Sequence, residues 1–236
     1  MTAGGRLYGL GIGPGDPELI TLKALRLLRS AAVVAYPAPE IGESLVRSIA
    51  ASYLSSTQEE FAIRLPMSPE RFPAETVYDR AAEVLGRHLA AGRDVAVLCE
   101  GDPFFYGSFM YLFARLAKRF PVEAVPGVSS LTACAGALEM PLAARNDVFS
   151  IVPAPLSAEA ITARIRESDA AAVIKVGRHF AKVREVLAGL DLLPQARYIE
   201  HASMASQRIL PLTKVDPTDV PYFSMILVHR RGEAWT

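Results

Sequence analysis

Short apolar runs alternate with amphipathic stretches through the first half of the chain. The runs are rich in β-branched residues and end at turn-forming residues, which is typical of buried strands. The amphipathic stretches carry apolar residues every three or four positions, which is typical of helices. The pattern predicts strands over 7–11, 32–36, 61–65, 94–98 and 122–125, helices over 17–29, 44–51, 74–91, 109–119 and 131–137, and a loop over 66–73. This alternation predicts a mainly parallel sheet.

The pattern changes near residue 126. Further strands are predicted over 147–152, 171–176, 197–201, 208–211 and 222–229, with the clearest helices over 157–166 and 180–187. The last three strands follow one another closely enough to pair antiparallel. We therefore expect an α/β protein of two α/β domains. Residues 1–122 would hold the mainly parallel sheet, and residues 123–236 would hold a mixed sheet.

A glycine-rich loop follows the first predicted strand. Three glycines and a proline fall within residues 11–15, more than a simple chain reversal needs. Asp16 is a candidate helix cap with Pro17 at the first helical position, and Thr21 is a rival cap. The dinucleotide-binding fingerprint would need glycine where Pro14 or Asp16 stands, and the chain has no Gly-Lys-Ser/Thr phosphate loop. Specific binding of NAD or ATP is therefore not expected.

A second loop, residues 100–107, follows the strand predicted over 94–98. It repeats the tripeptide Gly15-Asp16-Pro17 as Gly101-Asp102-Pro103. In a parallel sheet both loops would open at the same edge, where α/β proteins bind ligands, so two loops could face one ligand. The alternatives are that Asp102 only caps a turn and that the tripeptide recurs by chance.

Composition argues for a protein with a large core and against several other classes of protein. With 51% apolar residues and a mean hydropathy of +0.23, the 236-residue chain can bury a large core. Its 25 Lys and Arg residues balance 25 Asp and Glu residues, which argues against a general binder of nucleic acids or membrane surfaces. No apolar run has the length of a transmembrane helix, and no signal peptide is expected before the first strand.

Cysteine and histidine indicate neither a disulfide framework nor a metal site. Cys99 and Cys134 lie in apolar surroundings, and we expect buried thiols in a reducing, cytoplasmic compartment. The four histidines are scattered without the spacing of metal ligands: His88, His179, His201 and His229.

Four motifs, residues 11–24, 100–107, 126–129 and 200–208, together resemble the tetrapyrrole (corrin/porphyrin) methylases, which use S-adenosylmethionine. The resemblance covers nearly the whole chain. Within the family, residues 99–108 and 175–179 are most similar to the enzymes that methylate C20 of precorrin-2, giving precorrin-3A in cobalamin biosynthesis.

The resemblance implies a fold, a cofactor and a set of contacts. Members of the family have two α/β domains with the cofactor in a cleft between them, and they usually form homodimers. The residues of this chain at the family's cofactor-contact positions are Pro14, Gly101, Asp102, Phe105, Ser129, Ser130, Val176, Ala202 and Ser224.

The implied reaction is methyl transfer to a carbon of a small tetrapyrrole, for which positioning supplies much of the rate. Asp102 is expected to bind the ribose or amino group of the cofactor. Glu100 is the candidate for the proton that the substrate must lose. Cationic side chains suit the carboxylates of the macrocycle rim, although each could equally be a solvated surface charge. The candidates are Arg145, Lys175 and Arg178, with His179 beside them.

Two departures separate the chain from the uroporphyrinogen branch of the family. Glu100 stands where that branch often has glycine, and Val176 stands where methionine is frequent. The alternatives left open are a C20-methyltransferase acting on cobalt-factor II, another corrin-pathway methylase, and the family's protein- and RNA-modifying branches. A nucleotide-binding module without catalysis is the alternative from a different class.

Overall fold

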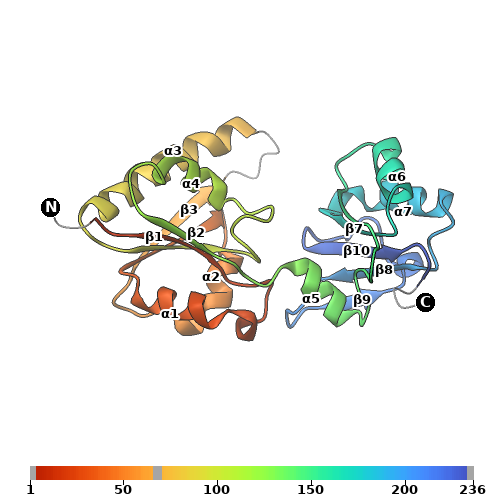
Figure 1. The fold of residues 1–236 in the computed structure, drawn as a ribbon, viewed down its shortest axis with the longest axis horizontal. Coiled ribbons are helices and arrows are strands. Elements are labelled where there is room, and N and C mark those ends of the chain that lie inside the picture. Colours follow the sequence, from red (N-terminus) through yellow and green to blue (C-terminus); the bar gives the residue numbers. More distant parts are fainter. Residues whose placement is uncertain (1–3, 66–70, 233–236) are drawn as a thin grey trace. The chain divides into compact units, whose positions relative to one another are not determined.

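A computed structural model describes residues 4–65 and 71–232. The chain divides into two compact units, residues 1–129 and 130–236, and each is described by itself (Figure 1). Strand β5 (Val122–Val125) pairs with a strand of the first unit. Residues 123–125 therefore lie in the first sheet, rather than in the second domain as expected. The sequence pattern of four residues predicts a strand, but it does not indicate which neighbouring strand it pairs with.

Unit 1 contains a five-stranded sheet in which all neighbouring strands run parallel. Its strands are β1 (Leu7–Gly11), β2 (Val33–Pro39), β3 (Glu59–Leu65), β4 (Val95–Cys99) and β5, in the order β3-β2-β4-β1-β5. The predicted parallel sheet is confirmed. Strands β4 and β5 flank β1, so the loops that follow these three strands leave the sheet side by side at its carboxyl edge.

Helices cover both faces of this sheet (Figure 1). On one face, α3 (Arg71–Ala90) and α4 (Phe109–Leu116) pack on side chains such as Leu7 and Val97. On the other face, α1 (Leu22–Ser30) and α2 (Leu45–Ala50) pack on side chains such as Leu10 and Leu98. Because successive side chains of a strand point to opposite faces, a sheet buried on both faces requires continuous apolar runs.

Asp16 and Thr21 both act as caps, and the helix expected over 17–29 is divided between them. The Asp16 carboxylate accepts the N–H of Glu18 at 2.8 Å and starts a 3₁₀ turn, Pro17–Leu19. The Thr21 hydroxyl accepts the N–H of Ala24 at 3.2 Å and starts α1. The two candidates are therefore consecutive caps rather than rivals.

Unit 2 contains a mixed sheet in the order β6-β7-β10-β8-β9. Its strands are β6 (Phe149–Pro153), β7 (Ala170–Ile174), β8 (Ala196–Glu200), β9 (Arg208–Leu210) and β10 (Ser224–His229). Strands β6 and β7 run parallel and the other pairs run antiparallel, which confirms the expected pairing of the last three strands.

Helices and 3₁₀ turns complete the second unit. Helices α6 (Ala158–Arg166) and α7 (Phe180–Gly189) cover one face of the sheet and bury side chains such as Ile161 and Phe180 (Figure 1). Helix α5 (Ser130–Ala137) begins the unit. Short 3₁₀ turns occupy Ala51–Tyr53 in unit 1, and Gly177–His179 and Leu212–Lys214 in unit 2.

The cysteines, the start of α3 and the lengths of the helices bear on three further expectations. Both cysteines are buried free thiols, as predicted. Helix α3 begins at Arg71, inside the loop expected over 66–73, and residues 66–70 of that loop lie outside the described part of the chain. Within residues 4–65 and 71–232, no helix is both long and apolar enough to cross a bilayer.

Candidate functional site

Three loops meet at the carboxyl edge of the first sheet. Gly13, in the loop after β1, and Gly101, in the loop after β4, form an antiparallel bridge. The N–H of Gly101 donates to the carbonyl of Gly13 at 2.8 Å, and the N–H of Gly13 donates back at 3.3 Å. The prediction that the two Gly-Asp-Pro loops open at one edge is confirmed, and the loops contact each other directly.

The third loop, after β5, approaches through Gly127. A Cβ atom on Gly127 would lie 2.0 Å from the carbonyl oxygen of Gly101 and 2.7 Å from the Cα of Gly11. A Cβ on Gly11 would in turn lie 2.5 Å from the Cα of Gly127. Real side chains do not come this close to backbone atoms, so only glycine permits the three loops to meet. Gly101 also has a φ of +63°, which glycine adopts without strain.

Asp102 fastens the second loop to the third. Its Oδ1 accepts the N–H groups of Phe104 and Phe105 at 2.9 and 3.1 Å, and its Oδ2 accepts the N–H of Gly127 at 3.1 Å. The turn-capping role considered above is therefore real. A carboxylate has about four acceptor sites, so these three bonds leave capacity for a ligand donor. Asp102 can both shape the edge and bind a ligand.

Glu100 stands at the start of the second loop and is partly buried. Burial raises its pKa, and a hydrogen bond from its own backbone N–H opposes that rise. Its neighbour Cys99 is fully buried, and burial, followed by the charges of Glu100 and Asp102, raises the pKa of this thiol well above its usual value. A carboxyl group that gives up its proton less readily than usual is suited to general acid–base chemistry.

Aromatic rings extend from the edge onto α4. The rings of Phe105 and Tyr106 meet at nearly 90° with centroids 5.1 Å apart, and Phe104 meets Phe113 edge-on at 5.3 Å. Phe104 and Tyr106 are each 49% exposed, so the edge presents an apolar aromatic surface. Among the other cofactor candidates of this edge, Pro14 is partly exposed beside Gly13, and Ser129 ends the unit.

The second group of cofactor candidates lies in unit 2. Ser224, at the start of β10, pairs with the end of β8, and its hydroxyl accepts the N–H of Gly177 at 3.4 Å. Gly177 follows Val176, which is buried just beyond β7, and Ala202 follows the end of β8. Val176, Ala202 and Ser224 are thus brought together at one edge of the second sheet. Ser130 is exposed at the start of α5.

A network of hydrogen bonds and charge around the buried Glu200 stabilises this edge of the second sheet. The Tyr198 hydroxyl donates to Glu200 Oε2 at 2.5 Å, and Arg208 Nε donates to the other oxygen. Glu200 is buried, and burial alone would raise its pKa. The hydrogen bonds from Arg208 and Tyr198 outweigh burial and hold this pKa below its usual value. Glu200 is therefore a paired structural carboxylate, directly before the turn that carries Ala202.

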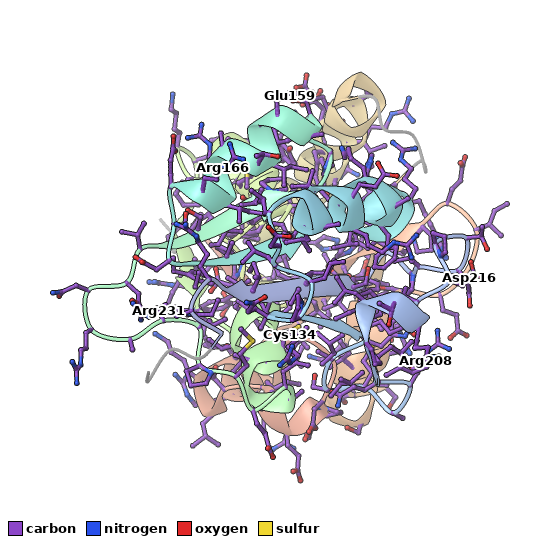
Figure 2. All side chains as sticks on the ribbon, turned by 90° about the vertical axis from the view of Figure 1, so that its right-hand side faces the viewer. Cys134, Glu159, Arg166, Arg208, Asp216 and Arg231 are labelled. Carbon is purple, nitrogen blue, oxygen red and sulfur yellow. The ribbon has the colours of Figure 1, made fainter. Side chains whose placement is uncertain are left out.

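The cationic candidates do not form one cluster. Lys175, Arg178 and His179 follow β7 at its carboxyl end, whereas Arg145 precedes β6 and lies near the amino ends of the parallel strands β6 and β7. A five-residue strand spans about 16 Å, so Arg145 lies at the opposite edge from the other three. Figure 2 shows the same separation. Arg231, which pairs with Asp147 in the turn 144–147 that contains Arg145, lies on one side of the unit, and Arg208 lies on the other.

A histidine–carboxylate pair was missed by the sequence analysis. His229 Nε2 lies 3.1 Å from Asp147 Oδ2, and both side chains are buried. Asp147 also accepts the N–H of Ala144 at 2.8 Å and a bond from Arg231 at 2.7 Å. The two residues are 82 positions apart, so no local motif marks them. The pair holds the turn 144–147, which contains Arg145, against the end of β10. It lies at the opposite edge of the sheet from Val176.

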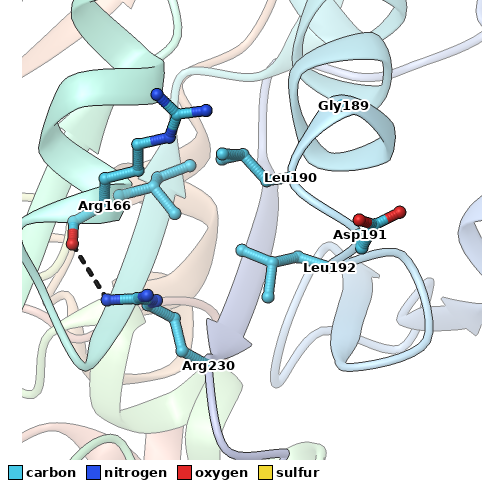
Figure 3. A pocket seen from close by; sticks show the side chains of 7 residues that line it. Arg166, Gly189, Leu190, Asp191, Leu192 and Arg230 are labelled. Atoms are coloured by element: carbon cyan, nitrogen blue, oxygen red, sulfur yellow. Dashed lines mark hydrogen bonds between the residues drawn. The ribbon is translucent and has the colours of Figure 1, made fainter.

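Two cavities lie outside these groups of residues. One of about 270 Å³ is lined by Arg166, Arg230 and residues 189–192, at the carboxyl ends of α6 and α7 (Figure 3). The other, of about 220 Å³, lies in unit 1 beside Tyr36 and Arg47. Neither contains a residue predicted for the site. The described part of the chain also brings together no group of three His, Cys, Asp or Glu side chains that could bind a metal ion.

Comparison with known proteins gives the family. Residues 6–216 match the family model of the tetrapyrrole (corrin/porphyrin) methylases. The chain is 45% identical to the cobalamin biosynthesis protein CobIJ of Mycobacterium tuberculosis, over 97% of this chain and 46% of that protein. It therefore spans about half the length of that relative.

Two other relatives match along nearly their full length. The chain is 39% identical to the precorrin-2 C(20)-methyltransferase of Sinorhizobium sp, over 95% of each protein. It is 33% identical to the cobalt-precorrin-2 C(20)-methyltransferase of Salmonella typhimurium, over 97% of this chain and 98% of that protein.

A solved structure supports the fold. The uroporphyrin-III C-methyl transferase of Thermus thermophilus, in complex with S-adenyl homocysteine, matches with a TM-score of 0.67 and 27% identity over 95% of this chain and 97% of that one. Together with the glycine-lined loops that meet around Asp102, these matches show that the chain belongs to the tetrapyrrole (corrin/porphyrin) methylase family.

Proposed function

We propose that the chain is an S-adenosylmethionine-dependent methyltransferase that methylates C20 of precorrin-2 to give precorrin-3A in cobalamin biosynthesis. The single observation that carries the proposal is the meeting of three glycine loops around the Asp102 carboxylate at the carboxyl edge of a parallel sheet. Ligands bind at such edges in open α/β sheets. The full-length match to a precorrin-2 C(20)-methyltransferase supports this substrate.

The residues at this edge fit the cofactor. Backbone groups of the glycine loops allow close approach, the Asp102 carboxylate has acceptor capacity for a ribose hydroxyl or an amino group, and Phe105 offers an apolar wall. S-adenosylmethionine supplies an electrophilic methyl group when bound. We place Pro14, Gly101, Asp102, Phe105 and Ser129 of unit 1 at its binding site. The candidates from unit 2 are Ser130, Val176, Ala202 and Ser224.

The chain's part in the chemistry is positioning and proton transfer. A meso carbon of the macrocycle is the nucleophile, so no covalent bond to the enzyme is needed, and alignment of the reacting atoms supplies much of the rate. The methylated carbon then loses a proton. Glu100 is the acceptor in this proposal, because its burial favours the protonated form that results.

Cations of unit 2 are assigned to the substrate's carboxylates. Lys175 and Arg178 lie together at the edge that carries Val176, with His179 next in the chain. Burial, then the charges of Lys182 and Arg178, lowers the pKa of His179, which indicates a locally positive surface suited to anions. Arg145 lies at the other edge and does not belong to this cluster, so its predicted role has no support from its neighbours.

The proposal also includes a homodimer, which the resemblance to the family implies, and a cytoplasmic location. Light scattering of the purified protein tests the dimer. A cobalt-containing substrate is the second candidate, since the chain also matches a cobalt-precorrin-2 C(20)-methyltransferase. The relatives differ by only six points of identity, 39% against 33%, and this difference favours the metal-free substrate.

A side-by-side assay tests the proposal. Purified protein with S-adenosylmethionine is given precorrin-2 or its cobalt complex under anaerobic conditions, and the products are analysed by mass spectrometry. Addition of one methyl group to precorrin-2, faster than to the cobalt complex, is the expected result. Methylation of the cobalt complex alone would reassign the substrate, and methylation of neither would refute the proposed function.

A further inference from the structure

The cavity of about 220 Å³ in unit 1 opens at the carboxyl ends of β2 and β3. Ala38, near the end of β2, is the register partner of Arg64, near the end of β3, and both line the cavity. Strand β2 is also the neighbour of β4, whose loop carries Glu100 and Asp102. Adjacent strands lie about 4.8 Å apart, so the backbone of Arg64 is about 10 Å from β4 across the sheet. The cavity therefore belongs to the same edge as the candidate site.

Hydrogen bonds fix the wall of this cavity between β2 and α2. The Ser44 hydroxyl, which is buried, donates to the carbonyl of Pro37 at 2.5 Å. Arg64 Nη1 donates to the carbonyls of Pro39 and Gly42 at 2.9 and 2.8 Å. Both ends of the segment that joins β2 to α2 are thus held in place. A preorganised wall of this kind lowers the entropy cost of binding a ligand.

The two arginines of the cavity differ in their partners. Arg47 donates from Nε and Nη2 to the carboxylate of Glu60, at 2.8 and 2.9 Å, so its charge is neutralised. Arg64 makes no ion pair among the described residues, and the carbonyls that it contacts do not neutralise its charge. A guanidinium has five N–H donors, and Nη1 carries two of them. Nε and Nη2 of Arg64, the pair of nitrogens with which Arg47 holds Glu60, therefore keep three donors for a ligand.

A carboxylate is the ligand that this arrangement fits. Its two oxygens match the two nitrogens of a guanidinium fork, and such charge-assisted pairs are strong. A cavity of about 10–15 Å³ can hold one water molecule, so this one has room for a short carboxylate side chain. Glu43 also lines the cavity and opposes an anion. It is exposed to solvent, which screens its charge.

We propose that this cavity binds one rim carboxylate of the tetrapyrrole through Nε and Nη2 of Arg64. The inference rests on the proposed function and deepens it, because it adds a substrate contact from unit 1, where Glu100 and Asp102 lie. A tetrapyrrole carries its carboxylates on short chains around the rim, away from the reacting carbon. A carboxylate held at β3 while the reacting carbon lies at the β4 loop restricts the rotation of the macrocycle, and this rotation decides which carbon is methylated.

The test measures substrate binding in a complex that cannot react. Protein saturated with S-adenosylhomocysteine is dialysed to equilibrium against precorrin-2 under anaerobic conditions. Arg64→Gln removes the charged fork and should weaken the binding of precorrin-2 by about tenfold or more. Its affinity for S-adenosylhomocysteine, measured by calorimetry, should not change.

A second variant in the same cavity should have the opposite effect. The Glu43 side chain makes no hydrogen bond or ion pair among the described residues, so Glu43→Gln leaves the fold intact. It removes a like charge and should tighten the binding of precorrin-2 by about two- to fivefold. The matched control is Arg87→Gln, which removes an exposed positive charge from the last turn of α3, before the amino end of β4. It should leave the affinity unchanged.

The outcomes separate this inference from the proposed function. Equal precorrin-2 affinities in Arg64→Gln, Arg87→Gln and the unmodified protein would overturn the carboxylate site and leave the proposed function standing. Weaker binding in Arg64→Gln without tighter binding in Glu43→Gln would also overturn the site, because Arg64 would then act only by holding the segment after β2. Absence of precorrin-2 binding by the unmodified protein would refute the proposed function, and this inference with it.

Discussion

Gly13 and Gly101 exchange two backbone hydrogen bonds, of 2.8 and 3.3 Å, although they belong to loops that leave two parallel strands. The bridge is antiparallel, so each loop turns back against the other directly after its strand. It makes the two Gly-Asp-Pro loops one structural element, to which Asp102 joins the loop that contains Gly127. The candidate site therefore depends on close backbone contact between residues 13, 101 and 127.

Gly127→Ala should separate the loops. Its Cβ would lie 2.0 Å from the carbonyl oxygen of Gly101, and forced overpacking of this kind costs about 1–3 kcal/mol. We expect a lower Tm and binding of S-adenosylhomocysteine at least about tenfold weaker by calorimetry. The control is Gly136→Ala in α5, where a Cβ meets nothing within 4 Å and should raise stability by up to about 1 kcal/mol. Equal affinities in the two variants would contradict the loop account.

Asp102→Ala should weaken cofactor binding and also loosen the edge. The substitution removes the acceptor for three backbone N–H groups, so we expect a Tm lower by a few degrees as well as an affinity for S-adenosylhomocysteine lower by about tenfold or more. Asp216→Ala is the control, because the Asp216 carboxylate accepts bonds from the N–H and the hydroxyl of Thr218, two residues further along the chain in unit 2. Unchanged affinity in Asp102→Ala would remove this residue from the site.

Tyr198→Phe should lower the stability of unit 2. Tyr198 donates at 2.5 Å to the buried Glu200, and hydrogen bonds to charged groups contribute about 1.5–3 kcal/mol. Loss of that bond should lower the free energy of unfolding. Urea unfolding of the variant and of the unmodified protein measures the difference. An unchanged free energy of unfolding would contradict a stabilising role for this bond.

Asp147 should make unit 2 sensitive to acid. The Ala144 N–H, followed by His229 and Arg231, lowers its pKa from 3.8 to about 2. A carboxyl with a lowered pKa stabilises the fold fully above its unfolded value, and this stabilisation is lost as the pH falls toward the folded value. Asp147→Asn should therefore have a lower Tm than the unmodified protein above about pH 4, with a difference that shrinks toward pH 2. A difference independent of pH would contradict this account.

The strands, the helices and the meeting of the two Gly-Asp-Pro loops could be predicted from the sequence because they depend on local pattern. Residues 7–11 and 94–98 read as buried strands, and strands in a parallel sheet place their loops at one edge. The pairing of β5 could not be predicted, because a run of four apolar-rich residues carries no information on its partner.

Functional details that depend on distant contacts were not predictable. The His229–Asp147 pair joins residues 82 positions apart. Arg145 and Arg178 are equally plausible carboxylate ligands in the sequence. Because β6 and β7 run parallel, Arg145, before β6, and Arg178, after β7, lie at opposite ends of these strands.

The position of the transferred methyl group tests the central claim most directly. The purified protein is given precorrin-2 and S-adenosylmethionine labelled with carbon-13 in the methyl group, and the product is examined by NMR. We predict one labelled methyl group on the meso carbon C20. Label on a pyrrole ring carbon would contradict the C20 assignment, and the absence of label from every tetrapyrrole, with authentic substrate and folded protein, would contradict the proposed function as a whole.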